Sequence, residues 1–248
     1  MQSSISPQYL ALLKQHQLAS FEQLWVYQGD WFEPPNRERG GWSGVNFIEL
    51  VDGLGKKQGF YLKRQQGHMR RTCWHPIAGE PTFVREFEMI RHLNQHHVVT
   101  PEVVYFSAQG NQALLLTRAL ESFVSLDSLQ ANRHLGFAQT SVLVRELANA
   151  VRSMHQAHVQ HRSLYDKHLF INDNTEVALI DFEKSRITSL IAYLKYADLI
   201  TLNYRTRYVS RTQKLRFFKN YVEIEHLTPW YKLICRYIHH KSQSKRNK

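Results

Sequence analysis

The sequence has few cysteines, no long apolar run and a shortage of acidic residues. Its 248 residues include two cysteines, Cys73 and Cys235, which lie far apart and form no CxxC pair, so we expect neither a disulfide framework nor a zinc site. No stretch approaches the ~20 apolar residues of a membrane-spanning helix. The N-terminal residues lack the basic and apolar segments of a signal peptide. These absences predict a protein of a reducing cytoplasm that is soluble or peripheral to a membrane.

Basic residues outnumber acidic ones. The sequence has 32 Lys and Arg and 21 Asp and Glu, which gives a formal net charge of +11. This charge favours polyanionic partners such as nucleotides, anionic lipid, acidic glycans or nucleic acid, and a solvated basic surface is the alternative. The longest basic segment without an acid lies between Asp198 and Glu223. Its cations are Arg205, Arg207, Arg211, Lys214, Arg216 and Lys219, interleaved with Tyr204, Tyr208, Phe217 and Phe218. Such a segment suits a phosphorylated lipid-linked sugar or a membrane surface, and it also suits nucleic acid.

The first half of the chain predicts a small sheet with one helix. Alternation of apolar and polar residues indicates strands, and apolar residues three and four apart indicate a helix. After a helical or mixed N-terminal appendage over 8–26, the predicted elements are strands 45–51 and 59–64, a helix over 83–94, and strands 103–106 and 113–117.

The second half predicts a mainly helical region. A long helix is expected over 139–158, followed by a loop and a strand pair over 161–181 and by further helical segments. The polar, basic tail is predicted to be disordered. We therefore expect three regions, with boundaries at 1–118, 119–240 and 241–248.

One motif carries most of the functional information. The segment from His161 to Ile171 reads HRSLYDKHLFI, and Asp181-Phe182-Glu183 follows ten residues later. A protein kinase has His-Arg-Asp in its catalytic loop, Asn five residues after that Asp, and then Asp-Phe-Gly. Ser163, His168 and Glu183 replace the Asp, the Asn and the Gly. The framework of a kinase loop is present, and the usual catalytic base is absent.

These residues resemble the lipopolysaccharide kinase (Kdo/WaaP) family, and within it the InaA-like proteins. Tyr165 and His168 match the catalytic-loop pattern of that family, and the segment LIDFEK over 179–184 matches its metal-binding turn. The resemblance covers about residues 38–205. It implies an α+β, two-lobed, protein-kinase-like fold, with a small antiparallel-sheet N-lobe carrying one helix and a mainly helical C-lobe. It also implies ATP and Mg²⁺ as cofactors.

The nucleotide-binding residues are expected in the first half. Lys63 is predicted at the end of a strand, where its ammonium would hold the α- and β-phosphates, and a carboxylate on the next helix would fix it. Glu86 matches the family pattern better than Glu88; the alternative is a surface lysine on an edge strand. A glycine-rich segment with Gly40, Gly41 and Gly44 precedes the first strand, where glycines let backbone N–H groups approach phosphates, and an ordinary turn is the alternative.

The metal and catalytic residues are expected in the second half. Asp181 ends an apolar strand, where a carboxylate suits Mg²⁺, and a turn-capping Asp is the alternative. His168 occupies the position of a second metal ligand, although imidazole is a poor ligand for Mg²⁺. Ser163 cannot act as a carboxylate base, and Asp166 is the nearest acid that could accept the proton. His161 and Asp198 are expected to be structural.

Together these features predict a cytoplasmic, ATP-dependent phosphotransferase of the lipopolysaccharide kinase type, which phosphorylates an envelope sugar or a related small acceptor. The expected partner is an anionic glycolipid or sugar, with a peripheral contact at the inner membrane. The alternative is a pseudokinase-like, nucleotide-binding regulatory or stress protein with little transfer activity, which Ser163 favours. A nucleic-acid-binding protein is a third, weaker hypothesis. The sequence predicts neither the acceptor nor the oligomeric state.

Overall fold

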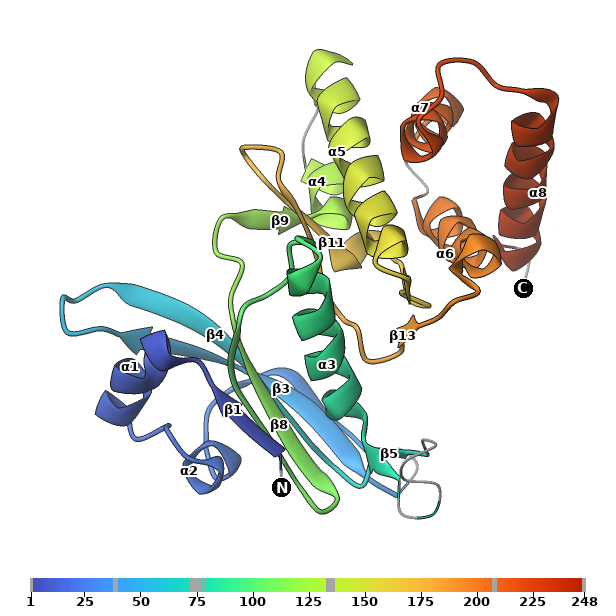
Figure 1. Cartoon of the computed structure of the whole chain (residues 1–248). Coiled ribbons are helices and arrows are strands. Elements are labelled where there is room, and N and C mark those ends of the chain that lie inside the picture. Colours follow the sequence, from blue (N-terminus) through green and yellow to red (C-terminus); the bar gives the residue numbers. More distant parts are fainter. Residues whose placement is uncertain are drawn as a thin grey trace. The chain divides into compact units, whose positions relative to one another are not determined.

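The computed structural model describes residues 2–37, 40–71, 77, 79–132, 137–206 and 209–246. The chain forms two compact units (Figure 1). One unit comprises Met1–Ile90 with Pro101–Glu121, and the other comprises Arg91–Thr100 with Ser122–Lys248. After residue 121 the chain leaves the first unit for the last time. The sequence predicted this boundary three residues earlier, between 118 and 119.

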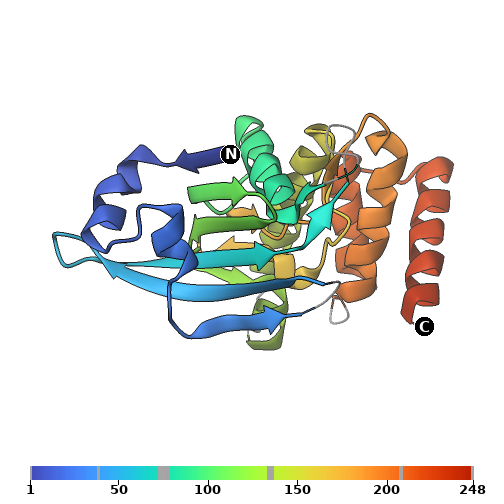
Figure 2. The ribbon, with the colours of Figure 1, turned by 90° about the horizontal axis from the view of Figure 1, so that it is seen from below.

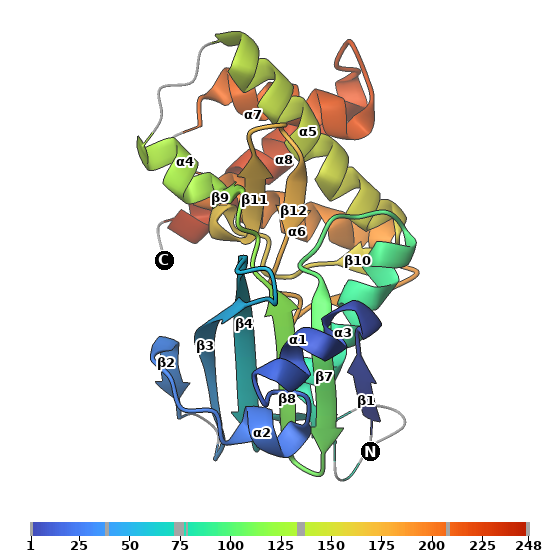
Figure 3. The ribbon, with the colours of Figure 1, turned by 90° about the vertical axis from the view of Figure 1, so that its left-hand side faces the viewer.

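The first unit is built on a six-stranded antiparallel sheet with the order β1-β7-β8-β4-β3-β2. Figure 3 shows the strands side by side in this order. The long β3–β4 hairpin is also clear in Figure 2. In its register, Val45 pairs with Lys63. The strands are β1 (Gln2–Ile5), β2 (Trp31–Asn36), β3 (Trp42–Val51), β4 (Lys57–Gln66), β7 (Val103–Gln109) and β8 (Gln112–Arg118).

Helices lie on both faces of this sheet. The short elements η1 (Pro7–Tyr9), α1 (Leu10–Gln15) and α2 (Phe21–Trp25) form one apolar core with Phe60, Leu62, Leu114 and Leu116, and Figure 3 shows α1 and α2 lying across the strands. On the other face, Phe87 of α3 (Thr82–Gln95) stacks on Phe106 of β7 with ring centroids 4.1 Å apart. Strand β8 is buried over its five central residues because both of its faces are covered.

The second unit is mainly helical. Helix α5 packs on α7 and α6 packs on α8. Its helices are α4 (Leu126–Asn132), α5 (Phe137–Gln156), α6 (Ile191–Arg205), α7 (Arg211–Val222) and α8 (Pro229–Arg246). Short strands hold the connecting loops in two small sheets: β12-β11-β9 (Val177–Leu179, Leu169–Asn172, Phe123–Ser125) and β10-β13 (Val159–Gln160, Arg186–Ile187). The turn η2 (Asp166–His168) precedes β11, and the first unit has a further strand pair, β5 (Met69–Arg70) and β6 (Glu80–Pro81).

This architecture confirms the predicted α+β, protein-kinase-like fold class, with the large antiparallel sheet in one unit and most of the helices in the other. Two expectations need correction. The segments β1 and β2 are strands that the sequence pattern did not indicate. The tail is helical through Arg246 rather than disordered from residue 241, because α8 continues along α6 and the Ser242 hydroxyl donates to the carbonyl oxygen of Ile200.

A membrane-spanning helix was not expected from the sequence. Among the residues described in the structure, no helix combines the length and the apolar character needed to cross a bilayer.

Candidate functional site

Lys63 lies inside β4, three residues before its end, between the neighbouring strands β3 and β8. The alternative of a surface lysine on an edge strand is therefore wrong. Side chains along a strand alternate between the two faces of the sheet. Since Phe60 and Leu62 face the core formed with α1 and α2, Lys63 faces the side that α3 covers.

The partner of Lys63 is Glu86 on α3. The Lys63 Nζ lies 2.6 Å from Glu86 Oε1, and the two side chains are 23% and 3% exposed. Glu88, the other candidate, is half exposed and lies 3.6 Å from Arg70. The structure therefore favours Glu86 as the carboxylate that orients the lysine, as the sequence predicted. A largely buried ammonium held at a fixed position is suited to binding phosphate oxygens.

The predicted glycine-rich segment divides into a turn and a strand. Gly40 and Gly41 lie in the turn between β2 and β3, next to residues 38–39, which lie outside the described part of the chain. A Cβ on Gly41 would lie 2.4 Å from the carbonyl oxygen of Gln66, and a Cβ on Gly44 would lie 2.7 Å from the Trp31 ring. Close packing therefore explains why glycine occupies both positions, and the expected contact of these glycines with phosphates stays a prediction.

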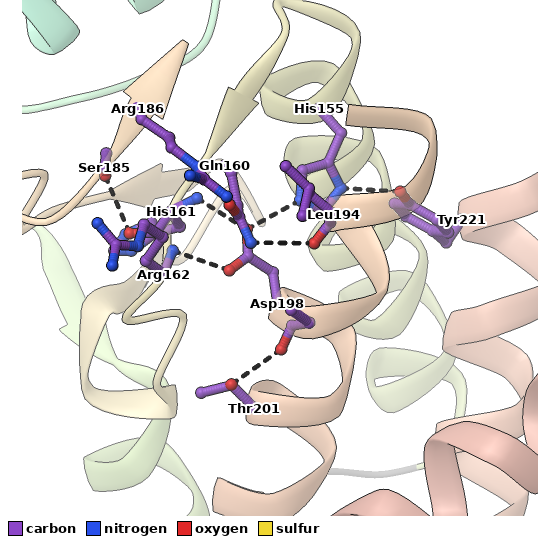
Figure 4. Close-up of polar contacts among 11 residues, drawn as sticks. His155, Gln160, His161, Arg162, Ser185, Arg186, Leu194, Asp198, Thr201 and Tyr221 are labelled. Carbon is purple, nitrogen blue, oxygen red and sulfur yellow. Dashed lines mark hydrogen bonds and ion pairs between the residues drawn. The ribbon is translucent and has the colours of Figure 1, made fainter. Parts of the chain in front are cut away.

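In the second unit, Asp198 of α6 holds the backbone of the catalytic-loop segment (Figure 4). Its two carboxylate oxygens accept the N–H groups of His161 at 2.7 Å and of Arg162 at 2.8 Å. Arg162 has a left-handed backbone conformation with φ of 67°, which is costly for a side-chain-bearing residue unless its surroundings fix it. Asp198 is 1% exposed, so these charge-assisted bonds form away from water. The predicted scaffold role of Asp198 fits this geometry.

Asp198 is itself positioned by a pair of residues that the sequence analysis did not identify. His155 Nε2, at the end of α5, donates to Asp198 at 3.2 Å, and the Tyr221 hydroxyl of α7 lies 2.8 Å from His155 Nδ1 (Figure 4). Burial raises the pKa of Tyr221, so its hydroxyl stays protonated and donates. The chain of bonds links three helices to the loop. His155 lies in the last turn of α5, six residues before His161, and this position is the signal that could have indicated it.

His161 joins the catalytic loop to the Asp181 turn. Its Nε2 donates to the carbonyl oxygen of Ile180 at 3.1 Å, and its ring packs against Phe182 with centroids 5.1 Å apart. The Ser185 hydroxyl donates to the His161 carbonyl oxygen at 3.1 Å. Burial lowers the pKa of His161, which keeps the ring neutral. These contacts agree with the predicted structural role of His161.

The centre of this half of the site is the pair His168 and Asp181. His168 Nδ1 donates to the carbonyl oxygen of Ser163 at 2.8 Å, which leaves Nε2 to face Asp181 Oδ2 at 3.2 Å. Burial lowers the pKa of His168 to about 4, so the ring is neutral at pH 7 and its Nε2 carries a lone pair. Two acceptors then face each other, and this arrangement is unfavourable unless a proton or a cation lies between them.

A divalent cation fits this donor pair. Two ligands on adjacent corners of an octahedron with bonds of about 2.1 Å lie roughly 3 Å apart, close to the separation of His168 Nε2 and Asp181 Oδ2. Asp181 has φ of 66°, so the turn holds its carboxylate in a constrained backbone conformation. No group of three or more His, Cys, Asp or Glu side chains with metal-binding geometry occurs in the described segments. The Asp181 carboxylate suits Mg²⁺, which takes most of its ligands from water and phosphates, whereas the His168 imidazole is the poorer ligand of the two for this ion.

Asp166 lies apart from these contacts. It begins η2, which packs against α4, and its pKa is raised mainly by burial, with a further contribution from Asp127 of α4. Its carboxylate accepts the N–H of Lys167 at 3.1 Å. The His168 ring thus contacts both the Ser163 carbonyl oxygen and Asp181, whereas the Asp166 carboxylate bonds to the backbone beside it. The role of Asp166 as a base stays a prediction.

A stack of rings stabilises the loop from the side. The Arg205 guanidinium lies over the Tyr165 ring at 4.4 Å, Tyr165 packs on His168 at 5.1 Å, and His168 lies nearly parallel to His161 at 6.0 Å. The sequence analysis had placed Arg205 only in the basic segment. Its spacing of seven residues from Asp198, which is two turns of α6, is the signal that places both residues near the loop.

The geometry defines a class of protein. A strand lysine paired with a helix glutamate, a loop held by a helix aspartate, and a carboxylate in the following turn are the positioned parts of a protein-kinase-like fold. The described residues include these parts, with substitutions at the positions of the catalytic base and of the second metal ligand.

Comparison with known proteins identifies the family. The model of the Lipopolysaccharide kinase (Kdo/WaaP) family matches residues 22–221. The chain is 33% identical to Protein InaA of Escherichia coli (strain K12) over 175 residues, which are 67% of this chain and 78% of that protein. The chain therefore belongs to the lipopolysaccharide kinase (Kdo/WaaP) family.

Protein kinases of eukaryotes also match, over shorter regions. The chain is 23% identical over 108 residues to a putative mitogen-activated protein kinase 14C of Drosophila melanogaster, which covers 42% of this chain and 30% of that kinase. It is 25% identical over 112 residues to mitogen-activated protein kinase HOG1A of Wallemia ichthyophaga, covering 45% of this chain and 30% of that kinase. Family membership supports a kinase-type function and, through it, the use of ATP.

Proposed function

We propose that the protein is an ATP-dependent phosphotransferase that acts on a hydroxyl group of an envelope lipopolysaccharide sugar or of a related small acceptor. The observation that carries this proposal is the facing pair of His168 Nε2 and Asp181 Oδ2, held in a loop that Asp198 fixes. His168 is 8% exposed and Asp181 is 37% exposed, and a cation between these two acceptors would compensate them. Membership of the lipopolysaccharide kinase family supports the same reading.

Each residue has a defined part in this proposal. Lys63, oriented by Glu86, would bind phosphate oxygens of ATP, and the backbone at Gly41 in the turn and at Gly44 in β3 would approach the same group. Asp181 and His168 would hold Mg²⁺, which would neutralise the charge that develops on the phosphates. Transfer would break the bond between the γ-phosphorus and the β-phosphate oxygen, form a bond to the acceptor oxygen and release ADP, and the acceptor proton would go to solvent or to a nearby base.

The missing carboxylate at Ser163 makes the proposed reaction slower without excluding it. A general base contributes typically ~10²–10⁴-fold to a rate, whereas positioning and charge neutralisation carry most of phosphoryl transfer. Asp166 is the candidate replacement base, because burial raises its pKa and makes it more basic. Its placement beside α4 is the observation against that role.

The acceptor and the location are supported by charge and by exposed apolar side chains. Helices α7 and α8 contain no acidic residue, and α7 carries Arg211, Lys214, Arg216 and Lys219. On α8, Trp230, Leu233 and Tyr237 are 66%, 55% and 51% exposed. A basic helix with an exposed aromatic and apolar stripe suits an anionic membrane surface. We place the protein in the cytoplasm, with a peripheral contact at the inner membrane through which it reaches an anionic glycolipid.

A second function is favoured by Ser163 alone. Without a carboxylate at this position, the protein would bind the nucleotide and act as a regulatory or stress protein with little transfer. The two functions predict the same nucleotide site and differ in turnover.

The decisive experiment measures nucleotide binding and turnover side by side. Thermal melts with ATP and Mg²⁺ should show a stabilisation that grows with ligand concentration, and the stabilisation should be lost in Asp181→Asn and Lys63→Met. Matched controls are Asp173→Asn, an exposed acid in the same unit, and Lys57→Met, an exposed lysine on the same strand as Lys63. Absence of any shift at millimolar nucleotide would contradict both functions.

Turnover separates the two functions. Phosphate transfer from ATP to a lipopolysaccharide-core acceptor above the level of Asp181→Asn would support the kinase. A full nucleotide-dependent shift without transfer to any acceptor, in the wild type and in Ser163→Asp, would support the regulatory protein.

A further inference from the structure

The second unit contains a cavity of about 380 Å³ that no part of the proposed reaction uses. It lies among the five helices of the unit, and β11 closes one side. Its apolar walls are formed by Leu126 and Leu129 of α4, Leu143, Val144 and Leu147 of α5, Leu169 of β11, Leu199 and Leu202 of α6, Phe217 and Phe218 of α7, and Ile238 of α8.

The cavity is partly open to solvent, and most of its lining is apolar. The Leu, Val and Phe side chains of its walls offer no hydrogen-bond partners, so water does not fill that part of the space favourably. Concave, mainly apolar sites with a few polar groups are typical of small-molecule binding sites. The position, with apolar side chains from six separate elements converging on it, therefore points to an apolar occupant.

The volume sets the size of that occupant. An apolar cavity of about 150 Å³ binds benzene, which has six carbon atoms. By the same ratio, the volume of about 380 Å³ has room for roughly fifteen carbon atoms. The cavity also falls within the range of small-molecule sites, which is about 300–1,000 Å³.

One part of the wall is polar and carries a positive charge. The polar lining residues are Thr140, Asn203, Thr206, Gln213 and Lys214. Lys214 Nζ donates to the carbonyl oxygen of Asn203 at 2.9 Å, which places the ammonium where α6 and α7 meet the cavity. With further cations and no acids along α7, this part of the wall favours a negatively charged group.

We propose that this cavity binds the aliphatic chain of a single-chain amphiphile with an anionic head group, of the size and chemistry of a long-chain fatty acid, with its carboxylate beside Lys214. Two wall residues, Leu169 and Leu199, directly follow His168 and Asp198 in the sequence, so that the occupant packs against the elements that carry the loop. The ligand is a free amphiphile in solution, and an acyl chain drawn from a bilayer is the alternative source.

Direct binding of saturated fatty acids of increasing length, each below its micelle concentration, tests the proposal. Isothermal titration should show one saturable site, with affinity rising about fourfold for each added methylene and then levelling off near the chain length that fills the cavity. The fatty alcohol of the same length tests the role of charge, and vesicles of the corresponding phospholipid test the alternative source.

Two pairs of matched variants locate the site. Val144→Phe fills the cavity and should weaken fatty-acid binding at least tenfold, whereas Arg145→Phe places the same ring on the neighbouring exposed position and should leave it unchanged. Lys214→Gln should weaken binding of the acid several-fold and leave binding of the alcohol unchanged, and Lys219→Gln on the same helix is its control. Should Val144→Phe fail to fold, Phe217→Ala, which enlarges the cavity, should shift the levelling-off to longer chains.

Each outcome decides the proposal. Saturable binding that is weakened by Val144→Phe and not by Arg145→Phe supports it. No saturable binding to the wild type, equal affinity of the two phenylalanine variants, or binding to vesicles without binding of the free acid overturns it.

Discussion

Among the candidate functional residues, each unit has a nitrogen base facing a carboxylate, and the two pairs differ in how their charges are compensated. In the first unit, the ammonium of Lys63 meets Glu86 at 2.6 Å, so that opposite charges compensate each other. In the second unit, a neutral His168 faces the carboxylate of Asp181 at 3.2 Å, so that two acceptors meet. The two charges of the first pair compensate each other, whereas the second pair needs a proton or a cation between its two acceptors. The dependence of stability on a bound ligand should therefore reside mainly in the second pair.

The largest effect is expected at the residue that holds the second pair in place. Asp198→Ala removes the acceptor of the His161 and Arg162 N–H groups and of His155. Buried hydrogen bonds to a charged group contribute about 1.5–3 kcal/mol each, so we expect the free energy of unfolding to fall by about 4 kcal/mol. Urea titration measures it, and Asp173→Ala is the exposed control. A loss below about 1 kcal/mol would show that Asp198 does not hold the loop.

A smaller but still large effect is expected for the balanced pair. Lys63→Met leaves the Glu86 carboxylate, which is 3% exposed, without its cation. Breaking a buried ion pair by removing one partner costs about 3–5 kcal/mol, and the partial exposure of Lys63 places the expected loss near the lower figure. Lys57→Met on the same strand breaks the exposed pair with Glu49 and should cost less than about 1 kcal/mol. Equal losses in the two variants would contradict the buried character of the first pair.

The third effect uses pH to distinguish the two pairs. The pKa of His168 is about 4 in the folded protein and about 6.5 in an unfolded chain, so between these values the unfolded state binds the additional proton. Stability from the neutral ring is complete above about pH 6.5 and is lost as the pH falls toward 4, with a limit of roughly 3 kcal/mol. Denaturation of the wild type and His168→Asn between pH 4 and 7.5 should give two curves that diverge over this window.

Magnesium sharpens the same measurement. A cation between His168 and Asp181 binds the neutral ring, and in the folded protein this ring takes up a proton only near pH 4. Mg²⁺ with ATP should therefore stabilise the wild type similarly at pH 7 and pH 5, and less at pH 4. The stability of the wild type is measured against pH with and without Mg²⁺ and ATP. If the two curves run parallel throughout, His168 and Asp181 are not the metal site.

Much of the fold was accessible from periodicity, and the exceptions have physical causes. The alternation in β4 predicted the strand that carries Lys63, and the apolar spacing of residues 83–94 predicted α3. Strand β2 was not indicated because it contains Pro34 and Pro35, which cannot donate to a ladder and are tolerated only at an edge, where β2 lies. The helical tail was not indicated because its composition is polar, whereas its helix is stabilised by packing on α6, which the sequence pattern does not show.

The sequence named the candidate residues of the site, and their catalytic and binding roles stay predictions. The loop motif placed His161, His168 and Asp181 correctly as neighbours, because the spacing of that motif is specific. The motif could not show that Asp166 would lie against α4, since this depends on a helix forty residues earlier in the chain. It also could not show that burial would make His168 neutral, which is what makes the second pair dependent on a ligand.

The smallest effect is expected at the edge of the second pair, where Arg205 stacks on Tyr165 and Tyr165 packs on His168. Arg205 is exposed, and an exposed cation–π contact contributes about 0.5–1 kcal/mol. Arg205→Ala should lower the free energy of unfolding by that amount, while Arg205→Lys should retain part of it. Because the stack supports the His168 ring, the same change should also weaken the Mg²⁺-dependent stabilisation of the protein and leave the Lys63 and Glu86 pair unaffected. A double-mutant cycle of Arg205→Ala and Tyr165→Leu measures the contact directly. A coupling energy of zero would show that the stack adds nothing to the second pair, and its balance would then depend on Asp198 and His161 alone.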